Sequence, residues 1–253
     1  MKIIVRLLAA FALAAPGLAT PNFASAQEKT AIRDGFEFPQ DRRARVLLFR
    51  PSIKVGAQST GGMFEPRAEW TEAARVNIEA ALDSYQVNLG HVVVEQPETF
   101  GYDAQLVREY QALFGAVARS VIDYQFFIGN RLETKKQDNR EDKFRWSLGP
   151  GVADLPGAEN ADYVLFINTE DHYGSTGRKI LQVLAAASVG YGVKSGLHAG
   201  YAGLVDLKTG DVLWINADYA MGGDVREAEG AEKRMRQLLE EFPLASEGAE
   251  TQR

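Results

Sequence analysis

Apolar residues along this chain alternate between short continuous runs and longer stretches in which they recur every three to four positions. The short runs are typical of buried strands and predict strands at residues 46–49, 91–95, 163–167, 201–206 and 212–219. The longer stretches predict helices over about 67–85, 103–122 and 225–242. Because helices separate the early strands, we expect those strands to pair in parallel and the last two to form an antiparallel hairpin.

Each predicted helix carries one apolar stripe that is expected to face the sheet. Asp103 is a candidate cap for the second helix, and Pro243 is expected to end the third. The three stripes consist of Trp70, Ala74, Ile78, Ala81, Leu82 and Tyr85; of Leu106, Tyr110, Leu113, Phe114, Val117 and Val121; and of Ala231, Met235, Leu238, Leu239 and Phe242.

The segments between these elements are predicted to be turns and loops. Residues 52–66 are rich in glycine and proline and predict a mobile loop, whereas residues 129–145 carry charges of both signs and predict a solvated loop or helix extension. Pro150 is suited to the first turn of a short helix. Gly210 is suited to a hairpin turn, whose ordinary turn chemistry also explains the flanking aspartates Asp206 and Asp211.

The first 26 residues have the order of a secretory signal. Lys2 and Arg6 precede a short apolar run over residues 7–18, and small residues at Ala24 and Ala26 match a signal-peptidase site. We therefore expect a cleaved signal peptide and a periplasmic location. The remaining chain is expected to divide into a polar lead-in at 27–45, a single α/β domain at 46–242 and a flexible tail at 243–253.

Composition narrows the classes of function. The chain has 28 basic and 34 acidic residues, a net charge of −6, which disfavours binding to nucleic acid. It has no cysteine, so thiol catalysis, thiolate metal sites and lipoprotein-type lipidation are not expected. The three histidines, His91, His172 and His198, lack the spacing of a zinc helix. We predict no catalytic, metal or cofactor site and no cofactor.

Two segments keep alternatives open. Asp171, His172 and Ser175 lie close in sequence and raise the alternative of a hydrolase, although they match no nucleophile-elbow motif and also suit a loop whose polar groups satisfy one another. Residues 180–193 are almost wholly apolar, with three alanines and two glycines. They suit a buried helix or strand pair, or a surface that contacts other copies or the outer membrane.

Three motifs carry a resemblance to known proteins. They are Trp146–Val152 (WSLGPGV), Ala161–Phe166 (ADYVLF) and Gly203–Trp214 (GLVDLKTGDVLW). With the predicted element order, the chain resembles proteobacterial envelope proteins that share the fold of the TolB amino-terminal domain and of the curli secretion channel family. That resemblance implies a mixed sheet packed by about three helices, and a mostly non-catalytic role in assembly or secretion.

These observations favour a non-enzymatic, exported accessory or assembly protein of the cell envelope that acts through protein contacts. The partner would be an envelope protein, a homo-oligomer is among the expected assemblies, and residues 180–193 could provide a peripheral contact with the outer membrane. The alternatives are a membrane-inserting ring subunit similar to a secretion channel, which needs 180–193 to meet lipid, and the hydrolase already described.

Overall fold

A computed structural model describes residues 29–86, 89–126, 144–189 and 196–243 of the chain, and only the backbone of residues 185–189. The expected signal peptide therefore lies outside the described residues, as do most of the charged segment at 129–145 and of the tail at 243–253. Within the described residues, no helix has the length and the apolar character needed to cross a bilayer.

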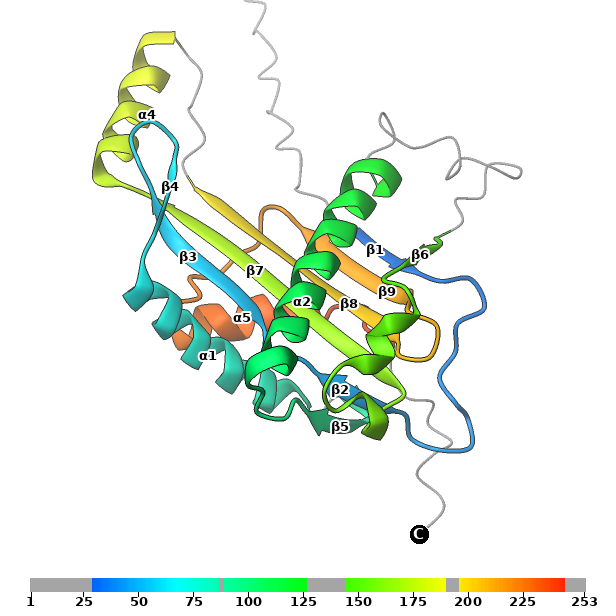
Figure 1. The fold of residues 1–253 in the computed structure, drawn as a ribbon. Helices are drawn as coiled ribbons and strands as arrows, with labels where there is room; N and C mark the ends of the chain where they lie inside the picture. The colour runs from blue at the N-terminus through cyan, green and yellow to red at the C-terminus, as the bar shows by residue number, and fades with distance from the viewer. Residues whose placement is uncertain (1–28, 87–88, 127–143, 190–195, 244–253) are drawn as a thin grey trace, which may run out of the picture.

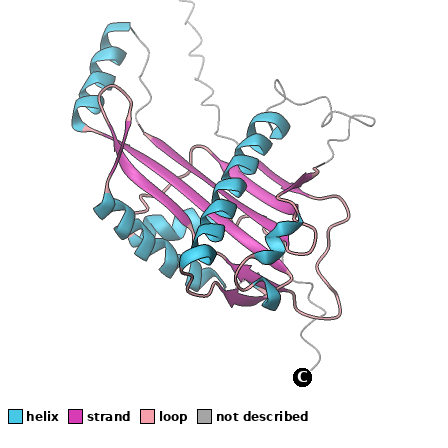
Figure 2. Ribbon diagram, in the orientation of Figure 1, coloured by secondary structure: helices cyan, strands magenta, loops and turns pink. Residues whose placement is uncertain are grey.

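The described chain forms one mixed sheet with helices on both faces (Figures 1 and 2). The main strand order is β1-β9-β8-β7-β2-β5, with β3 paired to β7 and β4, and β6 paired to β9. The prediction of an α/β chain with a single mixed sheet is confirmed. The strands are β1 (Lys29–Ile32), β2 (Arg45–Leu48), β3 (Ser52–Gln58), β4 (Phe64–Pro66), β5 (Val92–Glu95), β6 (Trp146–Ser147), β7 (Tyr163–Gly174), β8 (Leu197–Asp206) and β9 (Asp211–Asp218).

Parallel pairing occurs early in the chain and antiparallel pairing late, as the element order predicted. β2 runs parallel to β5 and β7, and β3 runs parallel to the outer half of β7. β7, β8 and β9 follow one another in antiparallel order. The hairpin at 201–219 is thus docked beside the strand at 163–167.

The helices divide between the two faces of the sheet. Figure 1 shows α1 (Ala68–Gln86) and α5 (Ala228–Leu238) on one face and α2 (Gly101–Val121) on the other. α4 (Thr176–Val189) projects beyond the end of the sheet. A π-helical turn (Ile122–Phe126) follows α2, and short 3₁₀ turns occupy Pro150–Asp154 and Ala158–Asn160.

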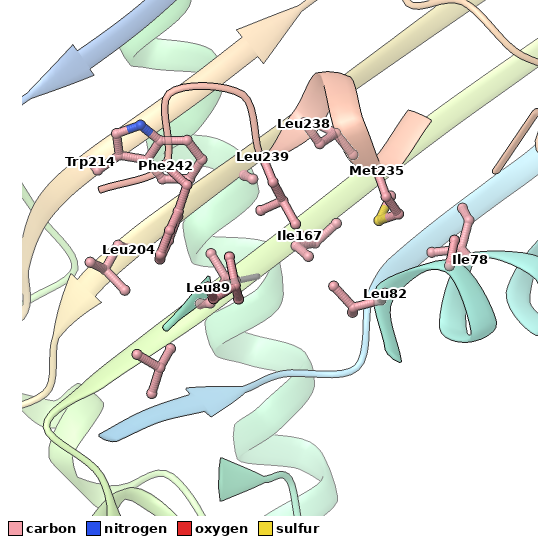
Figure 3. Close-up of a cluster of buried hydrophobic side chains, with 14 of the residues drawn as sticks. Ile78, Leu82, Leu89, Ile167, Leu204, Trp214, Met235, Leu238, Leu239 and Phe242 are labelled. Atoms are coloured by element: carbon pink, nitrogen blue, oxygen red, sulfur yellow. The ribbon is translucent and has the colours of Figure 1, made fainter. Parts of the chain in front are cut away.

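Strand alternation assigns the core residues to two clusters. In β7, Leu165 and Ile167 face α1 and α5, whereas Val164 and Phe166 face α2. Figure 3 shows the first cluster, in which Ile78 and Leu82 of α1 and Met235 and Leu238 of α5 meet Ile167, Leu204 and Trp214 of the sheet. Every one of these seven side chains is at most 2% exposed.

On the opposite face, one aromatic stack fixes the position of α2. The ring of Phe114 lies over that of Phe166, with centroids 4.9 Å apart and an interplanar angle of 17°. Gly203 lies beneath Phe114, because a Cβ there would be 2.6 Å from the phenyl ring. The helix therefore reaches the sheet only because residue 203 has no side chain.

Some sequence predictions were wrong in detail. β1 lies in the expected polar lead-in, and residues 52–66 form the β3–β4 hairpin rather than a mobile loop. Leu113 is 40% exposed, and Asp103 lies in the first turn of α2 instead of capping it. The strands were missed because short polar strands are stabilised by partners distant in sequence. The faces of α2 differ from the prediction because a helix takes the rotation that fits the sheet it covers.

Candidate functional site

The outer half of β7 carries a run of polar residues, Asn168 to Tyr173, that divides between the two faces of the sheet. Thr169, Asp171 and Tyr173 face α1 and α5, whereas the alternate residues face the α2 side. This run contains Asp171 and His172, which the sequence singled out. The strand geometry therefore places their side chains on opposite faces.

Asp171 is the centre of a buried charge cluster on the α5 side. Its carboxylate accepts two hydrogen bonds from Arg234 of α5, at 2.7 and 2.8 Å, and lies 2.8 Å from Nδ1 of His198 on β8. The Thr169 hydroxyl donates a further bond at 3.0 Å. Asp171 and Arg234 are both 0% exposed. A buried carboxylate is tolerated here because every oxygen has a partner.

The electrostatics of this cluster favour the ionised carboxylate. Burial raises the pKa of Asp171, but hydrogen bonds from His198 and Arg234 outweigh burial and hold the pKa below its ordinary value. Arg234 also donates to the carbonyl oxygens of Gly222 and Gly223, each at 3.3 Å. The pair thus connects α5, the central sheet and the loop after β9.

An aspartate bonded to one imidazole nitrogen is also how enzymes orient a general base. The His198 side chain is 32% exposed, and its Nε2 lies 3.2 Å from where a Cβ of Gly196 would be. Among the described residues, no hydroxyl forms a hydrogen bond to this nitrogen. The observed geometry is that of a structural anchor that links two strands and a helix.

A second polar group lies on the opposite face of β7. Nε2 of His172 is 2.8 Å from Glu170, whose other oxygen lies 3.7 Å from Arg119 of α2. The Phe64 ring stacks on the imidazole, with centroids 4.2 Å apart. Gly56 makes room for that ring, because a Cβ there would be 2.4 Å from it.

Ser175 has a third role, at the start of α4. Its hydroxyl accepts a hydrogen bond from the backbone N–H of Arg178 at 3.3 Å, in the manner of a helix cap. Asp171 and His172 point to opposite faces, and the Ser175 hydroxyl serves the helix. The structure does not bring together the three residues on which the hydrolase alternative depends.

A cluster of aromatic and charged side chains holds the loop after β9 against α1. The Tyr173 hydroxyl donates to Asp224 at 2.7 Å, and Arg226 binds the same carboxylate at 2.6 and 2.9 Å. The Arg226 guanidinium also lies 3.8 Å from the Tyr173 ring centroid and 4.5 Å from that of Trp70. The hydrogen bonds from Arg226 lower the pKa of Asp224 to about 2.

The resemblance motifs meet at the other end of the sheet. Asp206 accepts hydrogen bonds from the N–H groups of Lys208 and Thr209, both at 2.8 Å, which confirms the predicted turn. The turn residue Gly210 has φ 76° and accepts a bond from the N–H of Leu148 at 2.7 Å. The motif at 146–152 therefore packs on the hairpin turn.

The third motif is held at the same end. Asp162 binds the Arg42 guanidinium through both oxygens, at 2.7 and 2.8 Å, and also accepts the N–H of Arg45. The hydrogen bonds from Arg42 lower the pKa of Asp162. Asp162, Asp206 and Asp211 thus serve structure, Asp211 through an ion pair with Arg33 at 3.0 Å.

The apolar segment at 180–193 begins as helix α4, and residues 190–193 lie outside the described part. The sequence left open a buried helix or strand pair, and the described residues exclude burial of its first turns. Ile180, Leu181, Val183 and Leu184 are 56%, 41%, 68% and 60% exposed. This is a concentration of exposed aliphatic side chains on one element.

Sequence reasoning missed Arg234 and the pairing of Asp171 with His198. One signal was present, because Arg234 lies on the buried stripe of α5 between Ala231 and Leu238. A charged residue in such a stripe requires a buried partner. Nothing local identified that partner, since Asp171 is 63 residues away. Among the described residues, no three His, Asp or Glu side chains gather as a metal ion would require.

Comparisons with known proteins identify no family. No family model matches the chain, and no curated protein matches it. Among solved structures, the chain is similar to a PelC dodecamer from Paraburkholderia phytofirmans, at 14% identity and a TM-score of 0.35, covering 87% of this chain and 99% of that one. A single-residue variant of the same PelC gives the same values. Likeness at this level leaves the function to be argued from the chain's own geometry.

Proposed function

We propose that this chain is an exported, non-enzymatic accessory protein of the cell envelope that acts through protein contacts, and that α4 is a contact with a second copy of the chain. Export is inferred from the order of residues 1–26. The observation that carries the contact is the exposed apolar surface of α4. The lack of convergence of Asp171, His172 and Ser175 supports a non-enzymatic role.

The four large apolar residues of α4 occupy neighbouring positions on the helix. Ile180 and Leu184 are four residues apart, Leu181 and Val183 flank them, and the stripe covers about half of the circumference at 100° per residue. An amphipathic helix in a globular protein normally buries such a stripe. Figure 1 shows α4 beyond the end of the sheet, where neither α1 nor α2 reaches it.

A second copy of the chain fits this stripe better than a lipid surface does. The charged residues of α4 are Arg178 and Lys179, and the whole chain has a net charge of −6. Arg178 and Lys179 attract acidic groups on a second copy and anionic lipid alike, and the net charge opposes both, so the comparison rests on the side chains of the helix. α4 has no aromatic residue of the kind that anchors interfacial helices in a lipid surface.

Light scattering on the chain without residues 1–26 tests the contact. We expect an oligomer at micromolar concentration, and we expect Val183→Glu to weaken association by at least about tenfold, since a buried valine contributes about 1.5–3 kcal/mol. Val76→Glu is the matched control, because Val76 is an exposed valine on α1 at 58% exposure. A wild-type monomer throughout this range would refute the contact.

Two further measurements address the remaining parts of the proposal. Co-sedimentation with anionic vesicles by a chain that stays monomeric in solution would favour the membrane-contact alternative. Cell fractionation of the full chain, with amino-terminal sequencing, tests export: a periplasmic product beginning at Gln27 is expected, and an intact cytoplasmic product would contradict it.

A further inference from the structure

A cavity of about 360 Å³ lies between α2 and the sheet surface formed by β3, β7 and β8. The helix leaves room for the cavity because α2 places three residues with small or no side chains there, Ala112, Gly115 and Ala116. The volume is at the lower end of the range for small-molecule sites. The cavity lies on the face opposite the Asp171 cluster and is lined by no residue of α4.

The charged residues that line this cavity are all basic. Lys54 of β3 and Arg108 and Arg119 of α2 contribute side chains to it. Arg119 lies 3.7 Å from Glu170, a carboxylate that does not line the cavity and that is also engaged by His172. Lys54 and Arg108 form no ion pair with any described residue. Three cations around one cavity in a chain of net charge −6 create a local positive field.

Neutral hydrogen-bonding groups complete the cavity floor. Tyr201 of β8 is only 7% exposed, yet its hydroxyl has no hydrogen-bond partner among the described residues. The Asn168 side chain is likewise unpartnered within the described chain. A Cβ at Gly115 would lie 3.3 Å from the Tyr201 hydroxyl and 3.7 Å from the Asn168 amide nitrogen. Both groups therefore point into the space that the missing side chain of Gly115 leaves open.

We propose that this cavity binds a small polar molecule through a phosphate or carboxylate group. Lys54, Arg108 and Arg119 supply the opposing charge, and the Tyr201 hydroxyl and Asn168 amide donate hydrogen bonds to the oxyanion or to the polar body that carries it. The Tyr201 hydroxyl and the Asn168 amide have no hydrogen-bond partner among the described residues, so both groups are available to bind a ligand in the cavity. The inference is independent of the contact through α4.

Titration calorimetry at low salt tests the site with glycerol 3-phosphate, inorganic phosphate and acetate, and with glycerol as the neutral control. We expect the anions to bind and glycerol not to bind. Arg108→Gln should weaken binding by about tenfold or more, because a charge-assisted hydrogen bond is lost, and Tyr201→Phe by about three- to tenfold. Arg75→Gln, on α1 at the other face, is the charge-matched control and should leave affinity unchanged.

Further measurements distinguish a lipid headgroup from a free anion as the ligand, and distinguish loss of binding from loss of folding. Vesicles of phosphatidylglycerol, compared with phosphatidylcholine, show whether the site accepts a lipid headgroup as well as a free anion. Gly115→Val should abolish binding by filling the cavity, and Tyr201→Phe should keep the wild-type Tm because the hydroxyl has no described partner. Absence of anion binding at millimolar concentration, or equal loss in Arg108→Gln and Arg75→Gln, would overturn the proposal.

Discussion

Replacing Arg234 by methionine should destabilise the fold more than any other single charge removal in α5. Methionine has a similar length and helix propensity. It leaves the Asp171 carboxylate, which is 0% exposed, without the guanidinium that donates to both of its oxygens. Breaking a buried ion pair in this way costs about 3–5 kcal/mol. We expect the lower part of that range, because His198 and Thr169 still contact the carboxylate.

The matched control lies two residues further along the same helix. Arg236 is 61% exposed and its ion pair with Glu232 is 3.8 Å long. Arg236→Met should therefore cost under about 1 kcal/mol. For a domain of this size, Tm falls by about 2–4 °C per kcal/mol, so a cost of about 3–4 kcal/mol for Arg234→Met should lower Tm by about 6–16 °C, and Arg236→Met should lower it by only a few degrees.

The pH dependence distinguishes the ion pair from simple packing. The folded-state pKa of Asp171 lies below its unfolded value, so its stabilising contribution is present above the unfolded pKa and is lost as pH falls through the folded pKa. In Arg234→Met we expect the folded pKa of Asp171 to rise, because the effect of burial is no longer offset by Arg234, and protonation of the carboxylate then relieves the cost. The difference in unfolding free energy between wild type and variant should therefore shrink as pH falls toward 4.

Chemical denaturation from pH 7 down to pH 4 measures this difference directly. A penalty for Arg234→Met no larger than that for Arg236→Met would refute the reasoning about burial. A large penalty that stays constant with pH would assign the effect to packing rather than to the charge of Asp171. The double variant with Asp171→Asn should recover part of the loss, because the unpaired charge is then removed.

Two further predictions concern close packing and the loop after β9. Gly203→Ala should lower the unfolding free energy by about 1–3 kcal/mol, because its Cβ would be 2.6 Å from the Phe114 ring; Gly61→Ala, where the nearest atom is 4.0 Å away, should be nearly neutral in the same denaturation assay. Asp224→Asn should weaken the link to Arg226 and increase hydrogen exchange in the 219–227 loop. Because the folded pKa of Asp224 is about 2, that loop in wild type should stay protected at pH 4 and loosen as pH approaches 2.

The position of the central strands, the two long helices and the late hairpin was available from the sequence alone. Val164 to Ile167, for example, are apolar without interruption, and such a run is stable only when both faces are covered. Gly210 likewise indicated a turn at its position, because glycine adopts a positive φ without the steric cost that other residues have. Patterns within about twenty residues thus determined the fold class and most of the core.

The candidate sites depended on contacts that no local pattern contains. Adjacent residues Asp171 and His172 alternate across the sheet, so their closeness in sequence separates them in function. The pairing of Asp171 with Arg234, the exposure of α4, and the meeting of Lys54, Arg108 and Tyr201 around one cavity arise from strand register and helix placement. Local periodicity states which face of an element is apolar, but only the packed chain decides what lies opposite that face.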